Sequence, residues 1–294
     1  MSRVRVAAAQ YDVGFHASFD AYAQKVRRWV AEAATQGAGL LVFPEYFSME
    51  LVSLFPESVR TSLSYQLDAL QSVLPDFLDL FRSLAREHGV YIVAGSYPVR
   101  VSGEHYRNRA YLLSSDGTVR HQDKIQMTRF ENEAWGVSPG DTLEVFETSF
   151  GCLGIAICYD SEFPLLARRQ VEAGATLIAV PSCTDTRSGY WRVRIGCQAR
   201  ALENQCYVVQ APLVGTAEWS PAVDVSTGKA GVYTPVDIGF PEDGVLASGT
   251  FDLPQWVYAD VDLAEVARVR ASGQVFNHRD WDGQHRAARC AYDR

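Results

Sequence analysis

Short apolar runs alternate with stretches of helical periodicity along most of this chain, and this alternation limits the possible folds more than any other feature. The runs at 4–9, 40–43 and 90–94 are rich in valine, isoleucine, leucine and small residues, which is typical of strands buried on both faces. Residues 17–35 instead repeat apolar side chains at helical spacing and are followed by Gly37, a residue suited to a helix terminus. Helices that alternate with apolar strands cover the faces of a sheet, so the sequence predicts an α/β layered fold.

The alternation continues to about residue 261, without a linker rich in proline, glycine or serine. We expect further helices at 63–88 (interrupted at Pro75), 164–173 and 191–203, a hairpin of 110–113 with 118–121, and strands at 150–157, 177–180, 206–209 and 256–261. Residues 1–270 are therefore expected to form one domain. Residues 271–294 have no such period, but they keep Val275, Phe276 and Trp281, and we expect this tail to pack at a subunit interface. A loose terminus is the alternative.

The composition excludes several classes of protein. Hydrophobic residues make up 47% and charged residues 21% of the 294 residues, as in globular proteins and unlike disordered chains. The formal net charge of −8 argues against binding to nucleic acid or to an anionic membrane surface. The longest stretch without charge, 204–217, has 14 residues and contains Pro212 and Gly215. A membrane-spanning helix needs about 20 apolar residues, so we expect no membrane partner and no nucleic-acid partner.

The cysteines indicate a reducing compartment. The six of them, at positions 152, 158, 183, 197, 206 and 290, form no Cys-x-x-Cys pair and are accompanied by no close pair of histidines. This spacing is not that of a disulfide framework or a zinc site. The N-terminal apolar run is also too short for a secretory segment. We therefore expect a cytoplasmic protein with reduced thiols and no bound metal.

One cysteine lies where a nucleophile is often found. Residues 151–157 form a strand of small and apolar residues, and Pro164 is suited to the first turn of the following helix. Cys158 therefore occupies a sharp strand-to-helix turn, the position of the nucleophile in many serine hydrolases. The alternative is a small buried core residue, which is what most free cysteines are. Cys183 also follows a strand end and is a candidate for the same rim.

A thiol needs a base or a neighbouring cation to become a nucleophile. None of the histidines follows a strand end, whereas Glu45 comes directly after a buried strand and a proline. Residues 37–45 resemble 174–182 in having a helix stop, a buried strand and then proline, which would bring both strand ends to one rim. Lys124 follows the predicted hairpin and would stabilise a thiolate, although a lone lysine is usually solvated and a lone glutamate usually exposed.

Several motifs occur together in a fixed order. They are Phe43-Pro44-Glu45, Asp123-Lys124-Ile125, Ser138-Pro139-Gly140-Asp141, Cys158-Tyr159-Asp160 with Phe163-Pro164, and Arg200-Ala201-Leu202-Glu203-Asn204. In order and separation this set resembles the nitrilase, or carbon–nitrogen hydrolase, superfamily over roughly residues 3–265. The resemblance implies an αββα sandwich that pairs with a second subunit into an αββα–αββα homodimer or a larger homo-oligomer.

The resemblance also implies a Glu-Lys-Cys triad, carried here by Glu45, Lys124 and Cys158. It implies a second glutamate in the loop after the lysine, and Glu133, six residues before Pro139, matches that position better than Glu131. The implied reaction is hydrolysis of a non-peptide carbon–nitrogen bond in a small amide through a cysteine thioester. It releases ammonia or an amine and needs no metal or organic cofactor.

The substrate-binding residues are expected around Cys158. The alternative for each candidate is an ordinary packing role in the core or at an interface. The candidates for the pocket lining are Phe130, Trp135, Tyr159, Cys183 and Trp191. Relatives that hydrolyse N-carbamoyl amino acids resemble one another in an arginine shortly after the cysteine, and this chain has Ser161 and Glu162 there. We therefore expect a neutral or amine-bearing amide, unless Arg187 or Arg192 replaces that arginine.

Two other functions are compatible with these residues. A nitrilase acting on a nitrile would use the same triad, and only a substrate assay separates it from an amidase. A non-catalytic interaction protein could keep the same dimeric fold, although all three triad positions are filled. A dinucleotide-binding dehydrogenase is excluded, because Gly37-Ala38-Gly39 precedes its strand and lacks a third glycine.

Overall fold

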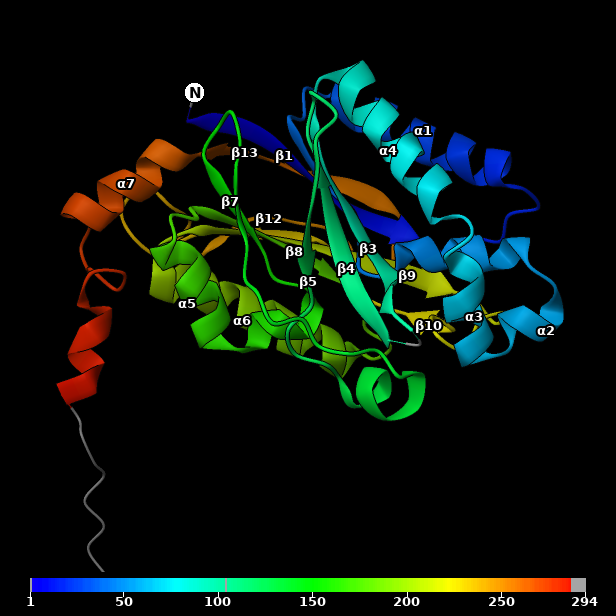
Figure 1. Ribbon diagram of the computed structural model, residues 1–294. Coiled ribbons are helices and arrows are strands. Elements are labelled where there is room, and N and C mark those ends of the chain that lie inside the picture. Colours follow the sequence, from blue (N-terminus) through cyan, green and yellow to red (C-terminus); the bar gives the residue numbers. More distant parts are fainter. Residues whose placement is uncertain (1, 104, 287–294) are drawn as a thin grey trace, which may run out of the picture.

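The computed structural model describes residues 2–103 and 105–286, which form strands β1–β13 and helices α1–α7 and η1–η4 (Figure 1). The strands are β1 (Arg3–Asp12), β2 (Leu40–Val42), β3 (Tyr91–Ser102), β4 (His105–Leu113), β5 (Val119–Asp123), β6 (Val145–Glu147), β7 (Cys152–Ile155), β8 (Leu177–Ser182), β9 (Tyr207–Thr216), β10 (Val225–Ser226), β11 (Gly231–Tyr233), β12 (Val245–Ser248) and β13 (Gln255–Asp262). The helices are α1 (Phe19–Thr35), η1 (Phe47–Leu54), α2 (Glu57–Arg60), α3 (Leu63–Leu70), α4 (Leu74–His88), η2 (Phe130–Trp135), η3 (Cys158–Glu162), α5 (Pro164–Glu172), α6 (Arg187–Asn204), α7 (Leu263–Ser272) and η4 (Asp280–Arg286). Within the described ranges, none of these helices is long and apolar enough to cross a membrane.

The strands form two halves that share one curled sheet. The first half has the order β5-β4-β3-β2-β1 and the second the order β9-β8-β7-β6. In the first half β2 runs parallel to β1 and β3, and in the second β8 runs parallel to β7 and β9. The halves join where the end of β1 pairs with β9, at Tyr11 opposite Leu213 and Asp12 opposite Val214. The sheet therefore folds back on itself around this short junction.

Alternation along β1 shows how the layers pack. Val4, Val6 and Ala8 belong to a core cluster that also contains residues of β7, β8 and β9, so they face the second half. Ala7 and Ala9 point to the opposite face and pack in the cluster that contains α1 and α4. Figure 1 shows α1 and α4 over the outer face of the first half, and α5 and α6 over that of the second. The predicted αββα sandwich is confirmed.

The structure differs from the sequence prediction in several elements. The interruption expected at Pro75 within 63–88 is present as a break between α3 and α4, but it lies at residues 71–73, because Pro75 fits the first turn of α4. The short strands β6, β10, β11 and β12 were not predicted, since two to four residues carry too little periodicity. Helix α7 was also not predicted, and it crosses the expected boundary at residue 270.

The described part of the predicted tail lies against its own chain. The Gln205 side chain donates to the carbonyl of Val275 at 3.1 Å and accepts from the amide of His278 at 3.2 Å. Arg168 of α5 donates to the His278 carbonyl at 3.0 Å and lies 4.8 Å from the ring centre of Trp281. The tail thus packs beside α5 and the end of α6, and its place at a subunit interface stays a prediction. Residues 287–294 of the tail lie outside the described residues.

Candidate active site

Glu45 lies at the carboxyl end of β2, buried between the two halves. Its exposed fraction is 1%. The chain turns sharply here because Gly95, with a φ of +53°, lets β3 approach: a Cβ at Gly95 would stand 1.9 Å from the carbonyl oxygen of Pro44. Glu45 Oε1 accepts hydrogen bonds from Lys124 Nζ at 2.7 Å and Asn108 Nδ2 at 2.8 Å. Its Oε2 accepts from the backbone amide of Cys183, in the second half, at 3.0 Å.

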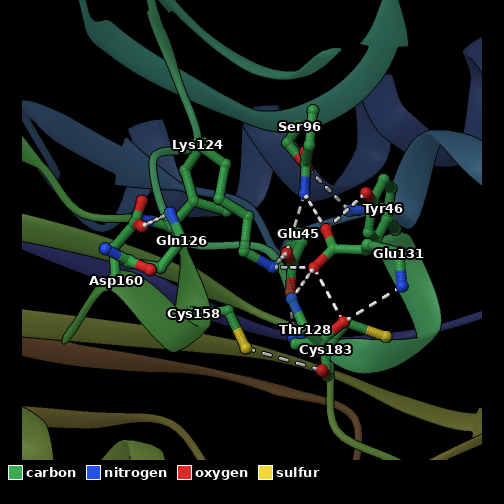
Figure 2. A network of polar contacts seen from close by, with 12 residues as sticks. Glu45, Tyr46, Ser96, Lys124, Gln126, Thr128, Glu131, Cys158, Asp160 and Cys183 are labelled. Atoms are coloured by element: carbon green, nitrogen blue, oxygen red, sulfur yellow. Dashed lines mark hydrogen bonds and ion pairs between the residues drawn. The ribbon is translucent and has the colours of Figure 1, made fainter. Parts of the chain in front are cut away.

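Lys124 follows β5 and is buried among carboxylates. Its Nζ donates to Glu45 and also to Glu131 Oε2 at 2.7 Å (Figure 2). The Ser138–Asp141 motif supports its backbone, because the amide of Gly140 donates to the Lys124 carbonyl at 2.7 Å. Burial favours a lower pKa for Lys124, but the charges of Glu131 and Glu45 overcome it and hold this pKa well above its ordinary value. Lys124 is therefore a fixed positive charge.

Cys158 begins η3 and is separated from the end of β7 by Ala156 and Ile157. It is buried, and its φ of +49° is uncommon for a residue with a side chain. Its Sγ lies 3.6 Å from the carbonyl oxygen of Cys183, the residue whose amide binds Glu45 (Figure 2). Burial, together with the charge of Glu45, raises the pKa of the Cys158 thiol well above its usual range. The raised pKa favours the protonated thiol over the thiolate.

Asp160 connects the segment after Lys124 to the segment before Cys158. Its carboxylate accepts from the backbone amides of Ile125 at 3.1 Å, Gln126 at 2.7 Å and Ile157 at 3.2 Å. Burial raises the pKa of Asp160 to about 7, against the lowering effect of Lys124 and these amides. Arg200 of the Arg200–Asn204 motif donates to the carbonyl of Ser161 at 3.2 Å. The turn that carries Cys158 is therefore bound both to the segment after Lys124, through Asp160, and to the Arg200–Asn204 motif, through Ser161.

The second glutamate beside Lys124 is Glu131, and the choice of Glu133 does not fit the structure. Glu131 is 2% exposed, and it accepts from Tyr46 Oη at 2.7 Å and from the backbone amide of Thr128 at 2.9 Å in addition to Lys124. Burial favours a higher pKa for Glu131, but Lys124 outweighs it and lowers this pKa. The Glu133 side chain is 56% exposed and forms an ion pair with Arg129 at 2.9 Å, away from Lys124.

Three polar neighbours in this network were not identified from the sequence. They are Tyr46, Asn108 and Thr128, of which Asn108 donates to both Glu45 and Glu131. Asn108 stands between Tyr106 and Ala110 on one buried face of β4, and a polar residue at such a position is a signal that could have revealed it. The other two become neighbours of Glu131 only through the shape of the loops.

These side chains lie at the base of a pocket of about 550 Å³. Phe130, Trp135, Tyr159 and Cys183 line it, as predicted, and Pro221, Ala222, Asp224 and Val225 of the segment 221–225 line it as well. Trp191 does not line it; its ring packs on Tyr190 and Phe251, with centroids 5.2 Å and 6.1 Å away.

Of the two arginines that could have held an anion, only Arg192 reaches the pocket, where its Nε lies 3.7 Å from Glu162. Arg187 pairs with Asp252 at 2.6 Å outside the pocket. Within the described part of the chain, no three His, Cys, Asp or Glu side chains are grouped as metal ligands. The arrangement offers a sulfur, a carboxylate and an ammonium around one cavity, which suits nucleophilic attack on a polarised carbon.

The chain is similar in sequence to known proteins. The family model described as carbon-nitrogen hydrolase matches residues 5–271. "Probable hydrolase YhcX" of Bacillus subtilis is 38% identical over 277 residues, which are 94% of this chain and 53% of that protein, so the chain spans about half of its length. "Omega-amidase NIT2-B" of Xenopus laevis is 30% identical over 262 residues, with 84% of each chain covered.

The fold is also that of solved structures. The C. elegans NitFhit protein superimposes with a TM-score of 0.77 at 24% sequence identity, over 96% of this chain and 66% of that one. Because the family model covers most of the sequence and the Xenopus relative is matched along most of its length, the family assignment does not depend on the fold alone. The chain belongs to the carbon–nitrogen hydrolase family.

Proposed function

We propose that this protein is an amidase that hydrolyses a small, non-peptide amide through a thioester at Cys158. The observation that carries the proposal is the meeting of Glu45, Lys124 and Cys158 in one buried pocket. Lys124 and Glu45 are 2.7 Å apart, and one residue, Cys183, contacts both Glu45 and the Cys158 sulfur through its backbone. The omega-amidase relative supports the same reaction class.

The first half of the proposed reaction forms the thioester. Glu45 takes the thiol proton of Cys158, whose raised pKa keeps it protonated until the substrate is bound. The sulfur then adds to the amide carbon, and the carbonyl oxygen becomes an oxyanion that Lys124 and the backbone N–H of Tyr159 stabilise. Glu45 returns the proton to the amide nitrogen as the carbon–nitrogen bond breaks, and ammonia or an amine leaves.

The second half regenerates the enzyme. Glu45 removes a proton from water, which adds to the thioester carbon, and the carbon–sulfur bond breaks to give a carboxylic acid. The proton on Glu45 then returns to the Cys158 thiolate. Glu131 does not exchange protons in this scheme; it holds the ammonium of Lys124 in place through a second ion pair, in addition to the one with Glu45 (Figure 2).

The test is ammonia release from a panel of amides, carbamoyl compounds and nitriles. We expect the intact protein to release ammonia from an amide, and Cys158→Ala to lose at least about 1,000-fold in kcat. Cys206→Ala is the matched control, because Cys206 is also a buried thiol but lies outside the pocket, and it should retain activity. Mass spectrometry of the quenched reaction should show the acyl group on Cys158. An unchanged rate in Cys158→Ala would contradict the proposal.

The same panel separates the alternative functions. Turnover of nitriles without amides would identify a nitrilase, and no turnover of any compound would leave a non-catalytic protein with this fold. We also propose that the protein is a cytoplasmic homodimer or larger homo-oligomer. Exposed apolar side chains on α5 and α6, Leu165, Ile195 and Leu202, support association. Light scattering on the purified protein would test it.

A further inference from the structure

More acidic than basic residues line the pocket. Beside the buried group of Glu45, Lys124 and Glu131, the lining contains the acids Glu162, Asp185 and Asp224 and the bases Arg129 and Arg192. A substrate bound at Cys158 would occupy the cavity that these side chains line. The excess of acidic or basic side chains that remain uncompensated therefore determines which charge is favoured at the end of the substrate remote from its amide.

The two arginines are already compensated. Arg129 donates to both oxygens of Glu133 at 2.9–3.2 Å, and its side chain is 89% exposed. Arg192 lies 3.7 Å from Glu162 and is also mostly exposed. A guanidinium that is engaged by a carboxylate and surrounded by water attracts a substrate anion only weakly.

The two aspartates are not compensated in this way. Within residues 2–103 and 105–286, neither Asp185 nor Asp224 forms an ion pair with a basic side chain. Among the described residues, the carboxylate of Asp224 accepts a hydrogen bond only from the neighbouring amide of Val225, at 2.9 Å. Burial and the charge of Glu45 raise the pKa of Cys183, which lines the pocket, to about 12, and the charge of Asp185 makes a smaller contribution in the same direction.

Both aspartates belong to one continuous wall. Asp185 follows β8 and Asp224 precedes β10, and these segments are joined by a hydrogen bond from the amide of Thr227 to the carbonyl of Thr184 at 2.8 Å. The aromatic residues Phe130, Trp135 and Tyr159 also line the pocket. Ring faces attract ammonium and guanidinium groups, so this lining favours the same charge as the aspartates.

We propose that the pocket selects amides whose remote end carries a positive charge, such as an ammonium or a guanidinium group. Asp185 and Asp224 bind that end while the amide carbon lies at Cys158. This inference rests on the proposed amidase function and adds the substrate class to it.

The first experiment compares three amides of similar length with the intact protein. Pentanamide is neutral, 5-aminopentanamide is cationic, and the monoamide of glutaric acid is anionic. We expect kcat/KM for the cationic amide to exceed that of the neutral one by roughly tenfold, since two exposed ion pairs are worth about that much. Salt should reduce this preference, because it screens exposed charges. Equal values, or a preference for the anionic amide, would overturn the inference.

A second experiment assigns the preference to residues. We expect the ratio of cationic to neutral kcat/KM to fall roughly tenfold in the double variant Asp185→Asn, Asp224→Asn, which keeps the hydrogen-bond acceptors. The control variant Glu242→Gln, Asp282→Asn removes two exposed acids outside the pocket, so it should retain the ratio. A ratio that is the same in both double variants would contradict the roles of Asp185 and Asp224.

A failure of this inference can be told apart from a failure of the proposed function. Hydrolysis of amides without a preference for the cation contradicts the inference alone. If none of the three amides is hydrolysed, calorimetric titration of the Cys158→Ala protein with each of them still measures the preference. Tighter binding of the cationic amide then supports the inference, and equal or absent binding overturns it.

Discussion

Glu131 and Glu133 lie two positions apart in η2 but in different surroundings. Glu131 is buried against Lys124, whereas Glu133 pairs with Arg129 at the surface. We expect Glu131→Gln to lower kcat by at least about 100-fold, because it leaves a buried ammonium with one carboxylate fewer and shifts Lys124. Glu133→Gln should change kcat by less than about twofold, since exposed ion pairs contribute little. Steady-state ammonia release measures both, and similar losses in the two variants would contradict this assignment.

Gly95 is where the backbone limits substitution most strongly. We expect Gly95→Ala to lower the free energy of unfolding by about 2–4 kcal/mol, because the added Cβ meets the Pro44 carbonyl as well as carrying the strain of a positive φ. Gly89→Ala is the matched control: its φ is +65°, but nothing lies within 4 Å of the Cβ position. Gly89→Ala should cost about 1 kcal/mol. Urea unfolding measures the free energy of unfolding of both variants. Equal losses in Gly95→Ala and Gly89→Ala would show that the contact with the Pro44 carbonyl adds nothing to the cost of the positive φ.

A site residue can be found from the sequence when the residues next to it along the chain mark its position. Glu45 and Cys158 follow strands directly and are recognisable from a proline or a small-residue run beside them. Asn108 and Tyr46 join the site only through the pairing of β3 with β4 and the turn at Gly95, which no short stretch of sequence records. Glu133 was preferred to Glu131 for its place six residues before Pro139. Counting along the chain does not reveal that Glu131 is the residue of η2 that is buried against Lys124, while Glu133 pairs with Arg129 at the surface.

At the scale of elements, most of the long helices and strands and the buried strands β2 and β7 can be predicted from the sequence, whereas β6, β10–β12 and α7 were not predicted. Helix α1 repeats apolar side chains at helical spacing, and strands β8 and β9 are nearly continuous apolar runs. Helix α6 also has such a repeat, but its members Trp191, Ile195 and Leu202 are exposed. The strands β10–β12 are held by their partners: β11 pairs with β9 and β12, so neighbours rather than their own composition determine them. The same neighbours position residues 221–225, which explains why the pocket rim could not be derived from the sequence.

The docking of residues 273–280 on α5 and α6 should depend on pH. Burial, with Arg270 and Arg168 nearby, lowers the pKa of His278 to about 4, below the ordinary value of 6.5. A depressed pKa in the docked state means that the stabilisation is complete above about pH 6.5 and is lost as the pH falls through 4. We expect the amides of this segment to lose protection from hydrogen exchange, corrected for intrinsic rates, between pH 6.5 and 4.

The control for this prediction is His278→Asn. The substitution keeps the backbone hydrogen bonds to Gln205 and Arg168 and removes the titrating ring. Its protection should be nearly constant over the same pH range. A loss of protection as large as that of the unmodified protein would assign the pH dependence to another group.

At the scale of the whole molecule, the site belongs to neither half of the sheet alone. Glu45, Lys124 and Glu131 come from the first half, Cys158 and Cys183 from the second, and the hydrogen bond from Cys183 to Glu45 crosses between them. We expect ammonia release and far-UV circular dichroism to decline at the same urea concentration, because separating the halves also exposes the core between them. Loss of activity at distinctly lower urea would show that the site opens before the fold is lost.

The reacting groups follow strand ends, whereas much of the pocket rim comes from η2 and residues 221–225. Strand ends are fixed by the core, and surface loops tolerate replacement. Exchanging residues 221–225 for the corresponding segment of another family member would therefore alter which compound is accepted while the attacking sulfur stays where it is. Substitutions in η2 and residues 221–225 can therefore change the substrate specificity of this fold while the reacting residues stay the same.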